Sequence, residues 1–250
     1  MKFLCLHGTG TNSQVFEIQT AALRHELNGS HTYEFVEGTI PAEIAPEILS
    51  IFPANGGYYN YFSPSDASVC LQSLMLFKAY VEKEGPFDIV LGFSGGCAAV
   101  MTLLLYYHQN NLKIPFRGAV FFSAGLPASP SALTSGSVDL LTRLPEGKEI
   151  AIPSAHFWGA EEIWPVGEGE VGWSESVSRM FKAEGVGMRE EWVHGGGHEV
   201  PGARMRGDLV MCVKGIRRVI WGVLEGIGRV STSTNFEGLI GYEPYSRTPL

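Results

Sequence analysis

The apolar run from Ile89 to Tyr107, "IVLGFSGGCAAVMTLLLYY", constrains the fold of this chain more than any other segment. It is interrupted by "GFSGG", which places Ser94 between glycines. A helix in lipid would gain nothing from these glycines, so the run does not predict a membrane span. It predicts a buried strand that turns sharply into a buried helix.

Short apolar runs alternate with stretches of helical period along the rest of the chain. The runs are rich in β-branched and aromatic residues, as buried strands are. Strands are predicted at 2–6, 33–37, 87–93, 118–124, 151–159 and 189–194. This alternation predicts the α/β class, with a mostly parallel twisted sheet and helices on both faces.

Apolar residues at helical spacing predict five helices between and after the strands. The first carries Phe16, Ile18, Ala22, Leu23 and Leu27, the second is capped by Asp66 or Ser68, and the third begins near Gly95. The fourth carries Val177, Met180, Phe181 and Glu184 and stops at Gly185, and the last begins near Asp208.

The length of 250 residues suits one large α/β domain. We expect that single domain at 1–228, because no repeat or linker divides it. Periodicity is lost beyond Gly228, so 229–250 is predicted to be a C-terminal strap or partly disordered tail.

The composition excludes several classes of partner and compartment. A formal net charge of -8 argues against nucleic acid or an anionic membrane as the main partner. The four cysteines lie apart in apolar runs, without metal-ligand spacing, and "MKFLCLHGTG" is too short in apolar residues for a signal peptide. We expect a cytoplasmic protein with reduced thiols.

Two insertions, at about 38–66 and 125–149, interrupt the alternation and are predicted to be lids or binding loops. The first is rich in aromatic residues, which either line an apolar acyl pocket or pack the insertion onto the body. These aromatic residues are Tyr58, Tyr59, Tyr61 and Phe62.

Ser94 is the candidate nucleophile. "GFSGG" fits G-x-S-x-G between a strand and a helix, which is the context of a nucleophile elbow. The free N–H groups and positive dipole end of the helix lie beneath the serine. The alternative is a turn of small residues with no chemistry.

His198 is the candidate base. A base is expected late in the chain, and "VHGGGHEVP" offers His194 at the end of a strand and His198 on a loop. The loop position favours His198. The two could also form a metal pair, but the three glycines between them disfavour the helix that such a pair needs.

A third residue, an acid that orients the histidine, is expected after the strand "AIPSAHFWG". None of the four aspartates, Asp66, Asp88, Asp139 and Asp208, fits that position. Glu161 and Glu162 follow the strand directly, and glutamate can orient an imidazole as aspartate does. The alternative is a Ser-His dyad with both glutamates solvated.

Two backbone N–H groups are predicted to form an oxyanion hole. One belongs to Gly95, after the serine, and the other to Thr9 in the loop "LHGTGTN". His7 in the same loop is predicted to have a structural role.

Four ordered segments resemble the fungal FSH-type serine hydrolases of the α/β-hydrolase superfamily. They are "FLCLHGTGTNSQVF", "GPFDIVLGFSGGCAA", "IPSAHFWGAEE" and "HGGGHEVP", and the resemblance spans residues 2 to about 225. It implies the α/β-hydrolase fold and esterase or thioesterase activity, with Ser94 as nucleophile and His198 as base. Where the family usually has aspartate this chain has Glu162, and the next stretch is about one residue short.

Some members of that family release acyl chains from carrier-protein thioesters of polyketide synthases. The resemblance therefore implies a small acyl ester or thioester substrate, with an acyl carrier domain as a possible partner and no cofactor or metal. A general carboxylesterase and a non-hydrolytic protein for ligand binding or rearrangement remain as alternatives, as does an interaction partner of a synthase with residual activity.

Overall fold

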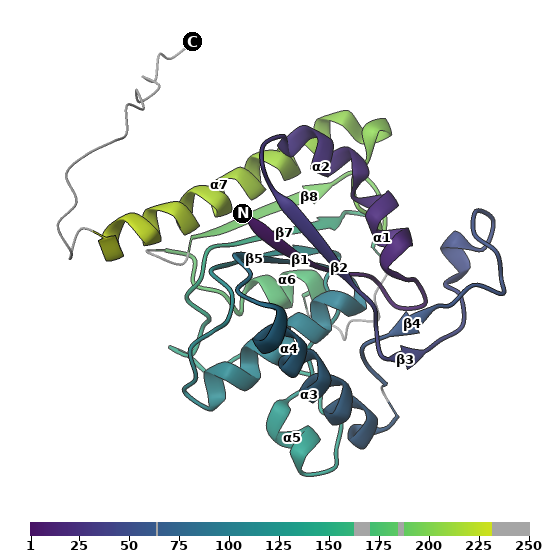
Figure 1. The fold of residues 1–250 in the computed structure, drawn as a ribbon, viewed down its shortest axis with the longest axis vertical. Helices are drawn as coiled ribbons and strands as arrows, with labels where there is room; N and C mark the ends of the chain where they lie inside the picture. Colours follow the sequence, from purple (N-terminus) through teal and green to yellow (C-terminus); the bar gives the residue numbers. More distant parts are fainter. Residues whose placement is uncertain (64, 163–170, 185–187, 232–250) are drawn as a thin grey trace.

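Six parallel strands form the central sheet of the computed structural model, which describes residues 1–63, 65–162, 171–184 and 188–231 (Figure 1). Their order is β2-β1-β5-β6-β7-β8, and every pairing between neighbours is parallel. The strands are β1 Lys2–Leu6, β2 Thr32–Val36, β5 Ile89–Phe93, β6 Gly118–Phe122, β7 Ser154–Gly159 and β8 Arg189–His194. The predicted α/β class is confirmed.

The register brings the carboxyl ends of the strands to one edge of the sheet. Leu6 of β1 pairs with Gly92 of β5, and Gly159 of β7 pairs with His194 of β8. The loops that follow these strands therefore meet at this edge, where open α/β sheets bind their ligands.

Helices cover both faces of the sheet (Figure 1). One face carries α1 Ser13–Gln19, α2 Ala21–Leu27 and α7 Arg206–Ser231. The other carries α3 Ala67–Glu84, α4 Gly95–Gln109, α5 Pro130–Thr134 and α6 Trp173–Ser178. Each face has its own hydrophobic core, so the central strand β5 is buried along its whole length.

Three helices differ from the sequence expectation. The helix expected across Phe16 to Leu27 is divided at Thr20, whose hydroxyl donates to the carbonyl of Phe16 at 2.7 Å. Helix α6 ends at Ser178, and Phe181 forms a bridge with Ile150; the predicted stop, Gly185, lies outside the described residues.

Helix α7 begins at Arg206 and continues to Ser231, past the predicted domain boundary at residue 228. The remainder of the predicted tail, 232–250, lies outside the described residues.

Several strands are shorter than the apolar runs that predict them. Strand β7 begins at Ser154 rather than at residue 151, because Pro153 has no N–H to give to a neighbouring strand. Strand β6 ends at Phe122, since the next residue, Ser123, has a positive φ of 50°.

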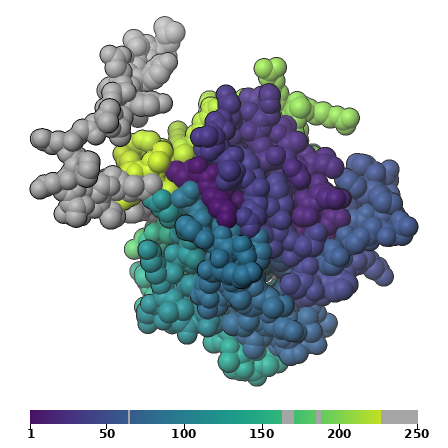
Figure 2. Space-filling view, in the orientation of Figure 1, coloured from purple at the N-terminus to yellow at the C-terminus, as the bar shows by residue number. Residues whose placement is uncertain are grey.

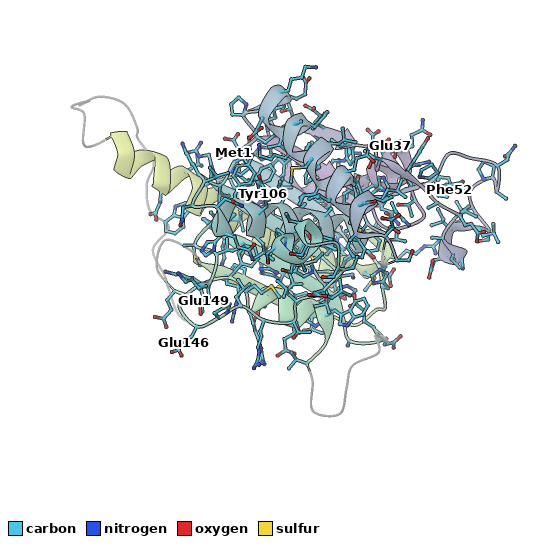
Figure 3. All side chains as sticks on the ribbon, turned by 90° about the horizontal axis from the view of Figure 1, so that it is seen from below. Met1, Glu37, Phe52, Tyr106, Glu146 and Glu149 are labelled. Atoms are coloured by element: carbon cyan, nitrogen blue, oxygen red, sulfur yellow. The ribbon has the colours of Figure 1, made fainter. Side chains whose placement is uncertain are left out.

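The first insertion projects beyond the sheet as a separate lobe (Figures 1 and 2). It contains the antiparallel pair β3 Ile40–Pro41 and β4 Tyr59–Asn60 and a short 3-10 helix, Pro46–Ile48. Phe52 lies at its outer part, away from the sheet (Figure 3). A small core of Val15, Ile48 and Tyr58 attaches the lobe to α1.

None of the helices in the described part of the chain is long and apolar enough to cross a membrane.

Replacing Gly96 with alanine should destabilise the fold. A methyl group at Gly96 would lie 2.5 Å from the carbonyl oxygens of Leu6 and His7, so α4 would have to move away from β1. Such overpacking typically costs about 1–3 kcal/mol. The melting temperature of Gly96→Ala should be several degrees lower in thermal unfolding.

The matched control is Gly207→Ala in the first turn of α7, where no atom lies within 4 Å of the added methyl. It should be neutral or slightly stabilising, because alanine has the higher helix propensity. Equal melting temperatures for wild type and Gly96→Ala would contradict the close packing of α4 on β1.

Candidate active site

Ser94 lies at a sharp turn between β5 and α4. Its backbone has φ 52° and ψ -117°, a combination that few residues other than glycine adopt. The turn is held because the Ser94 N–H donates to the carbonyl of Phe122 at 3.0 Å, while its carbonyl accepts from Cys97 and Gly125. These contacts hold the hydroxyl at the carboxyl edge of the sheet.

His198 contacts Ser94 directly. The Nε2 atom of His198 lies 2.9 Å from Ser94 Oγ, although the two residues are 104 positions apart in the chain. The ring of His198 packs on Phe93, with centroids 4.9 Å apart. A proton can pass from the serine hydroxyl to this imidazole without any movement of the backbone.

His194 lies elsewhere and is completely buried at the end of β8. Its Nδ1 accepts from the N–H of Gly196 at 3.3 Å, which stabilises the glycine turn leading to His198. Burial lowers its pKa, although the nearby Asp208 and Glu199 act in the opposite direction. Within the described ranges, no cluster of three or more His, Cys, Asp or Glu side chains is suited to hold a metal.

Glu162 lies behind His198. Its Oε1 is 3.6 Å from His198 Nδ1 and accepts from the N–H of Gly159 at 3.3 Å. Its Oε2 accepts from the Ser174 hydroxyl at 3.3 Å. Only 5% of the Glu162 side chain is exposed, whereas Glu161 is exposed to solvent.

The environment of Glu162 favours its ionised form. Burial acts to raise the pKa of this carboxyl, but the neighbouring His198 and Ser123 side chains and the hydrogen bond from the Gly159 N–H outweigh burial. The pKa is therefore held below the ordinary value for glutamate. A carboxylate in this position can orient the imidazole and stabilise an imidazolium.

Three of the four aspartates that did not fit the position of the acid have partners in other parts of the fold. Asp66 caps α3, Asp88 pairs with Arg117, and Asp208 accepts from Trp192.

Thr9 and Gly95 lie against each other beside Ser94. A methyl group on Gly95 would lie 2.4 Å from Thr9 Oγ1 and 3.4 Å from Thr9 N, so only glycine leaves room for the threonine. Gly95 begins α4, and its N–H is therefore among those without an acceptor in the helix. Two N–H groups so placed can stabilise negative charge on a bound oxygen.

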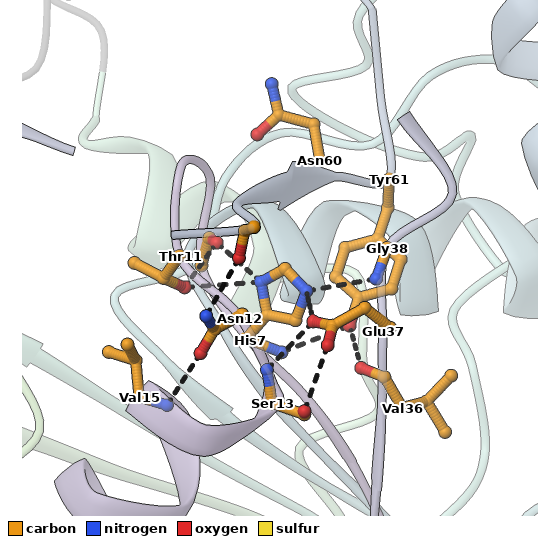
Figure 4. Close-up of polar contacts among 12 residues, drawn as sticks. His7, Thr11, Asn12, Ser13, Val15, Val36, Glu37, Gly38, Asn60 and Tyr61 are labelled. Carbon is orange, nitrogen blue, oxygen red and sulfur yellow. Dashed lines mark hydrogen bonds and ion pairs between the residues drawn. The ribbon is translucent and has the colours of Figure 1, made fainter. Parts of the chain in front are cut away.

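His7 connects this loop to the first insertion (Figure 4). Its Nδ1 lies 2.8 Å from the carbonyl of Gly8, and its Nε2 accepts from the N–H of Gly38 at 3.0 Å. Tyr61 accepts from the His7 N–H and donates to the carbonyl of Val36. His7 is buried and has the structural position expected of it.

A cavity of about 500 Å³ opens beside Ser94 and His198. The loop Gly8 to Thr11, Gln19 of α1 and the segment Ala42 to Ile48 of the first insertion form its other walls. Sequence reasoning selected Thr9 and the first insertion but missed Gln19 and the segment Ala42 to Ile48. These residues show neither the aromatic clustering nor the motif that drew attention to their neighbours.

The four aromatic residues proposed from the sequence do not line that cavity. Tyr58 belongs to the small core under the lobe, and Tyr59 pairs with Pro41 and Thr11. Tyr61 and Phe62 line a second, much smaller space next to α3. Their positions fit the packing of the insertion onto the body.

The chain matches known hydrolases in sequence. Residues 1–208 match the family model described as "Serine hydrolase (FSH1)". Esterase FPY3 of Fusarium mangiferae is 37% identical over 204 residues, which cover 80% of this chain and 88% of that protein. An esterase of Caenorhabditis elegans is 30% identical over 209 residues, which cover 80% and 86%.

The fold matches solved structures of lower sequence identity. The crystal structure of Arabidopsis thaliana SOBER1 superimposes with a TM-score of 0.55 at 15% identity, covering 88% of this chain and 99% of that one. At this identity the match shows a shared fold alone.

Glu162 should contribute stability that disappears in acid. Its pKa is lowered in the folded state, so the contribution is complete above the unfolded pKa of about 4.3 and is lost as pH falls through the folded value. The melting temperature of wild type should therefore fall more steeply than that of Glu162→Gln between about pH 6 and pH 3.

Glu161→Gln is the matched control, because its side chain is exposed, and it should follow wild type across the same range. Parallel curves for wild type and Glu162→Gln would contradict the hydrogen bonding described for Glu162.

Proposed function

The chain belongs to the FSH1 family of serine hydrolases, and from that premise we propose that Ser94, His198 and Glu162 form its catalytic triad. The observation that carries this proposal is the 2.9 Å contact between Ser94 Oγ and His198 Nε2. Glu162 takes the place of the acid, with its Oε1 on the far side of the imidazole.

In the first half of the proposed reaction, His198 accepts the Ser94 proton as the serine oxygen attacks the carbonyl carbon of an ester or thioester. Negative charge then develops on the carbonyl oxygen. The N–H groups of Thr9 and Gly95 are the proposed donors to that oxygen. His198 next gives its proton to the leaving alcohol or thiol, and the acyl group remains on Ser94.

In the second half, His198 accepts a proton from water, and the resulting hydroxide attacks the acyl-enzyme. The carboxylic acid is then released, and His198 returns the proton to the Ser94 hydroxyl. The Glu162 carboxylate stabilises the imidazolium that forms in each half. Nucleophile, base and acid all come from this chain.

For the substrate, we propose a polyketide or similar acyl chain released from a carrier-protein thioester. The motifs that resemble FSH-type hydrolases support this class, and the apolar residues Ala42, Ile44 and Ile48 in the cavity wall suit an acyl chain. We also propose a cytoplasmic location, because the four cysteines are buried thiols, unpaired in the described part of the chain.

A general carboxylesterase acting on small esters is the second candidate. It is favoured by the animal relative, an esterase that matches over 80% of this chain.

Loss of Ser94 should abolish turnover while leaving the fold intact. Ser94→Ala should lower kcat by about 10⁴-fold or more, because the acyl-enzyme can no longer form. His198→Ala should be comparably impaired. The measurements are hydrolysis of a p-nitrophenyl ester and labelling by a fluorophosphonate, and labelling of Ser94→Ala at the wild-type rate would overturn the assignment.

Variants of Glu162 and of its neighbour Glu161 test which residue is the acid. Glu162→Gln should lower kcat by about 10²- to 10⁴-fold, because His198 is then poorly oriented as a base. Glu161→Gln, one residue away and exposed, should stay close to wild type. If both variants keep wild-type turnover, the reaction runs on Ser94 and His198 without an acid.

The substrate class is tested by matched thioesters and p-nitrophenyl esters with acyl chains from two to about twelve carbons. Each buried methylene contributes about 0.8 kcal/mol, so kcat/KM should rise about threefold per carbon until the cavity is full. Thioesters should react at least as well as the matched esters. A maximum at acetate, or no thioester cleavage, would favour the general carboxylesterase instead.

A further inference from the structure

Gln19, which lines the cavity beside Ser94, has a side-chain acceptor that lacks a donor. The side-chain oxygen Oε1 of Gln19 is buried and has no hydrogen-bond partner among the described residues. A buried acceptor without a donor is costly, and a ligand that supplies the donor recovers that cost. Because nothing holds this oxygen, the amide can rotate toward a ligand without breaking a hydrogen bond.

Two acidic side chains of the first insertion also line the cavity. Glu43 and Glu47 line the cavity and are exposed, and neither pairs with a lysine or arginine in the described ranges. Among the described residues, those that line this cavity include no lysine or arginine. The wall formed by the first insertion is therefore negative as well as apolar.

The acyl part of the substrate is the part that fits the cavity beside Ser94 best. In the proposed reaction the leaving group departs after the first half, while the acyl group stays bonded to Ser94 until water cleaves it. The cavity described above opens next to Ser94 and can hold the acyl group during that interval.

We propose that this cavity selects an acyl group that carries a hydroxyl donor and no carboxylate. The inference rests on the proposed hydrolase function and narrows its substrate class. A hydroxyl hydrogen can meet Gln19 Oε1 or a carboxylate oxygen of Glu43 or Glu47, and the chain bearing it can pack on Ala42, Ile44 and Ile48. An acyl group that ends in a carboxylate meets like charges, and the described part of the cavity wall offers it no lysine or arginine.

The test compares p-nitrophenyl esters whose acyl chains have the same length and differ at one carbon. That carbon carries hydrogen, a hydroxyl or a carboxylate, and the hydroxyl is moved along the chain from the fourth to the tenth carbon. At its best position, the hydroxy ester should have a kcat/KM about five- to tenfold above the alkyl ester, from one additional hydrogen bond. The carboxylate ester should be about tenfold or more below the alkyl ester.

Variants of the cavity residues test which side chains cause these substrate preferences. Gln19→Met keeps the size of the side chain without its acceptor, and it should reduce the preference for hydroxy over alkyl esters. The double variant Glu43→Gln/Glu47→Gln should raise the carboxylate-to-alkyl ratio of kcat/KM about fivefold or more, since the charges that repel the substrate are gone. The matched control Glu26→Gln/Glu84→Gln removes the same net charge outside the cavity and should leave that ratio at the wild-type value.

Equal kcat/KM for the alkyl, hydroxy and carboxylate esters would overturn the inference, as would an unchanged ratio in the Glu43→Gln/Glu47→Gln variant. In either case, alkyl-ester cleavage that is lost in Ser94→Ala would leave the proposed function standing. If neither esters nor the matched thioesters are cleaved, the proposed function fails, and with it the inference that depends on it.

Discussion

The contact between the first turn of α4 and the end of β1 determines where the groups around Ser94 lie. At Gly96 the helix lies so close to β1 that an added Cβ would be 2.5 Å from the carbonyl oxygens of Leu6 and His7. This approach sets Ser94 above the sheet and brings Gly95 against Thr9. His7, at the same junction, extends the hydrogen bonding to the first insertion, so the cavity wall is tied to the same point.

Much of the fold could be predicted because both faces of the sheet are covered. Buried parallel strands are mostly apolar, so β1 is visible in the sequence with its observed bounds. Strand β8, at the edge of the sheet and only partly buried, was also predicted with its observed bounds. Local geometry was harder to predict. The division of the first helix at Thr20 depends on a side-chain hydrogen bond, and the early end of α6 depends on the pairing of Phe181 with Ile150, a contact distant in sequence.

For the site, the motifs were informative where backbone geometry imposes a residue type. The elbow requires glycines, so Ser94 could be identified, and the glycine turn pointed to His198. Elimination left Glu161 and Glu162, and only the family resemblance pointed to Glu162. The Ser174 hydroxyl that binds Glu162 has no local signal. The walls of the cavity escaped prediction for a similar reason: Gln19 and the segment Ala42 to Ile48 meet only through the tertiary fold.

The parallel topology of the sheet also determines how late in folding this site can form. Parallel neighbours cannot be joined by hairpins, so every pairing in the sheet waits for an intervening crossover, and folding is correspondingly slow. The serine and the histidine that contacts it are separated by 104 positions, with β6, β7 and β8 between them. During synthesis on the ribosome, Ser94 therefore emerges long before His198, and the contact between them can form only after the last strand of the sheet has been made.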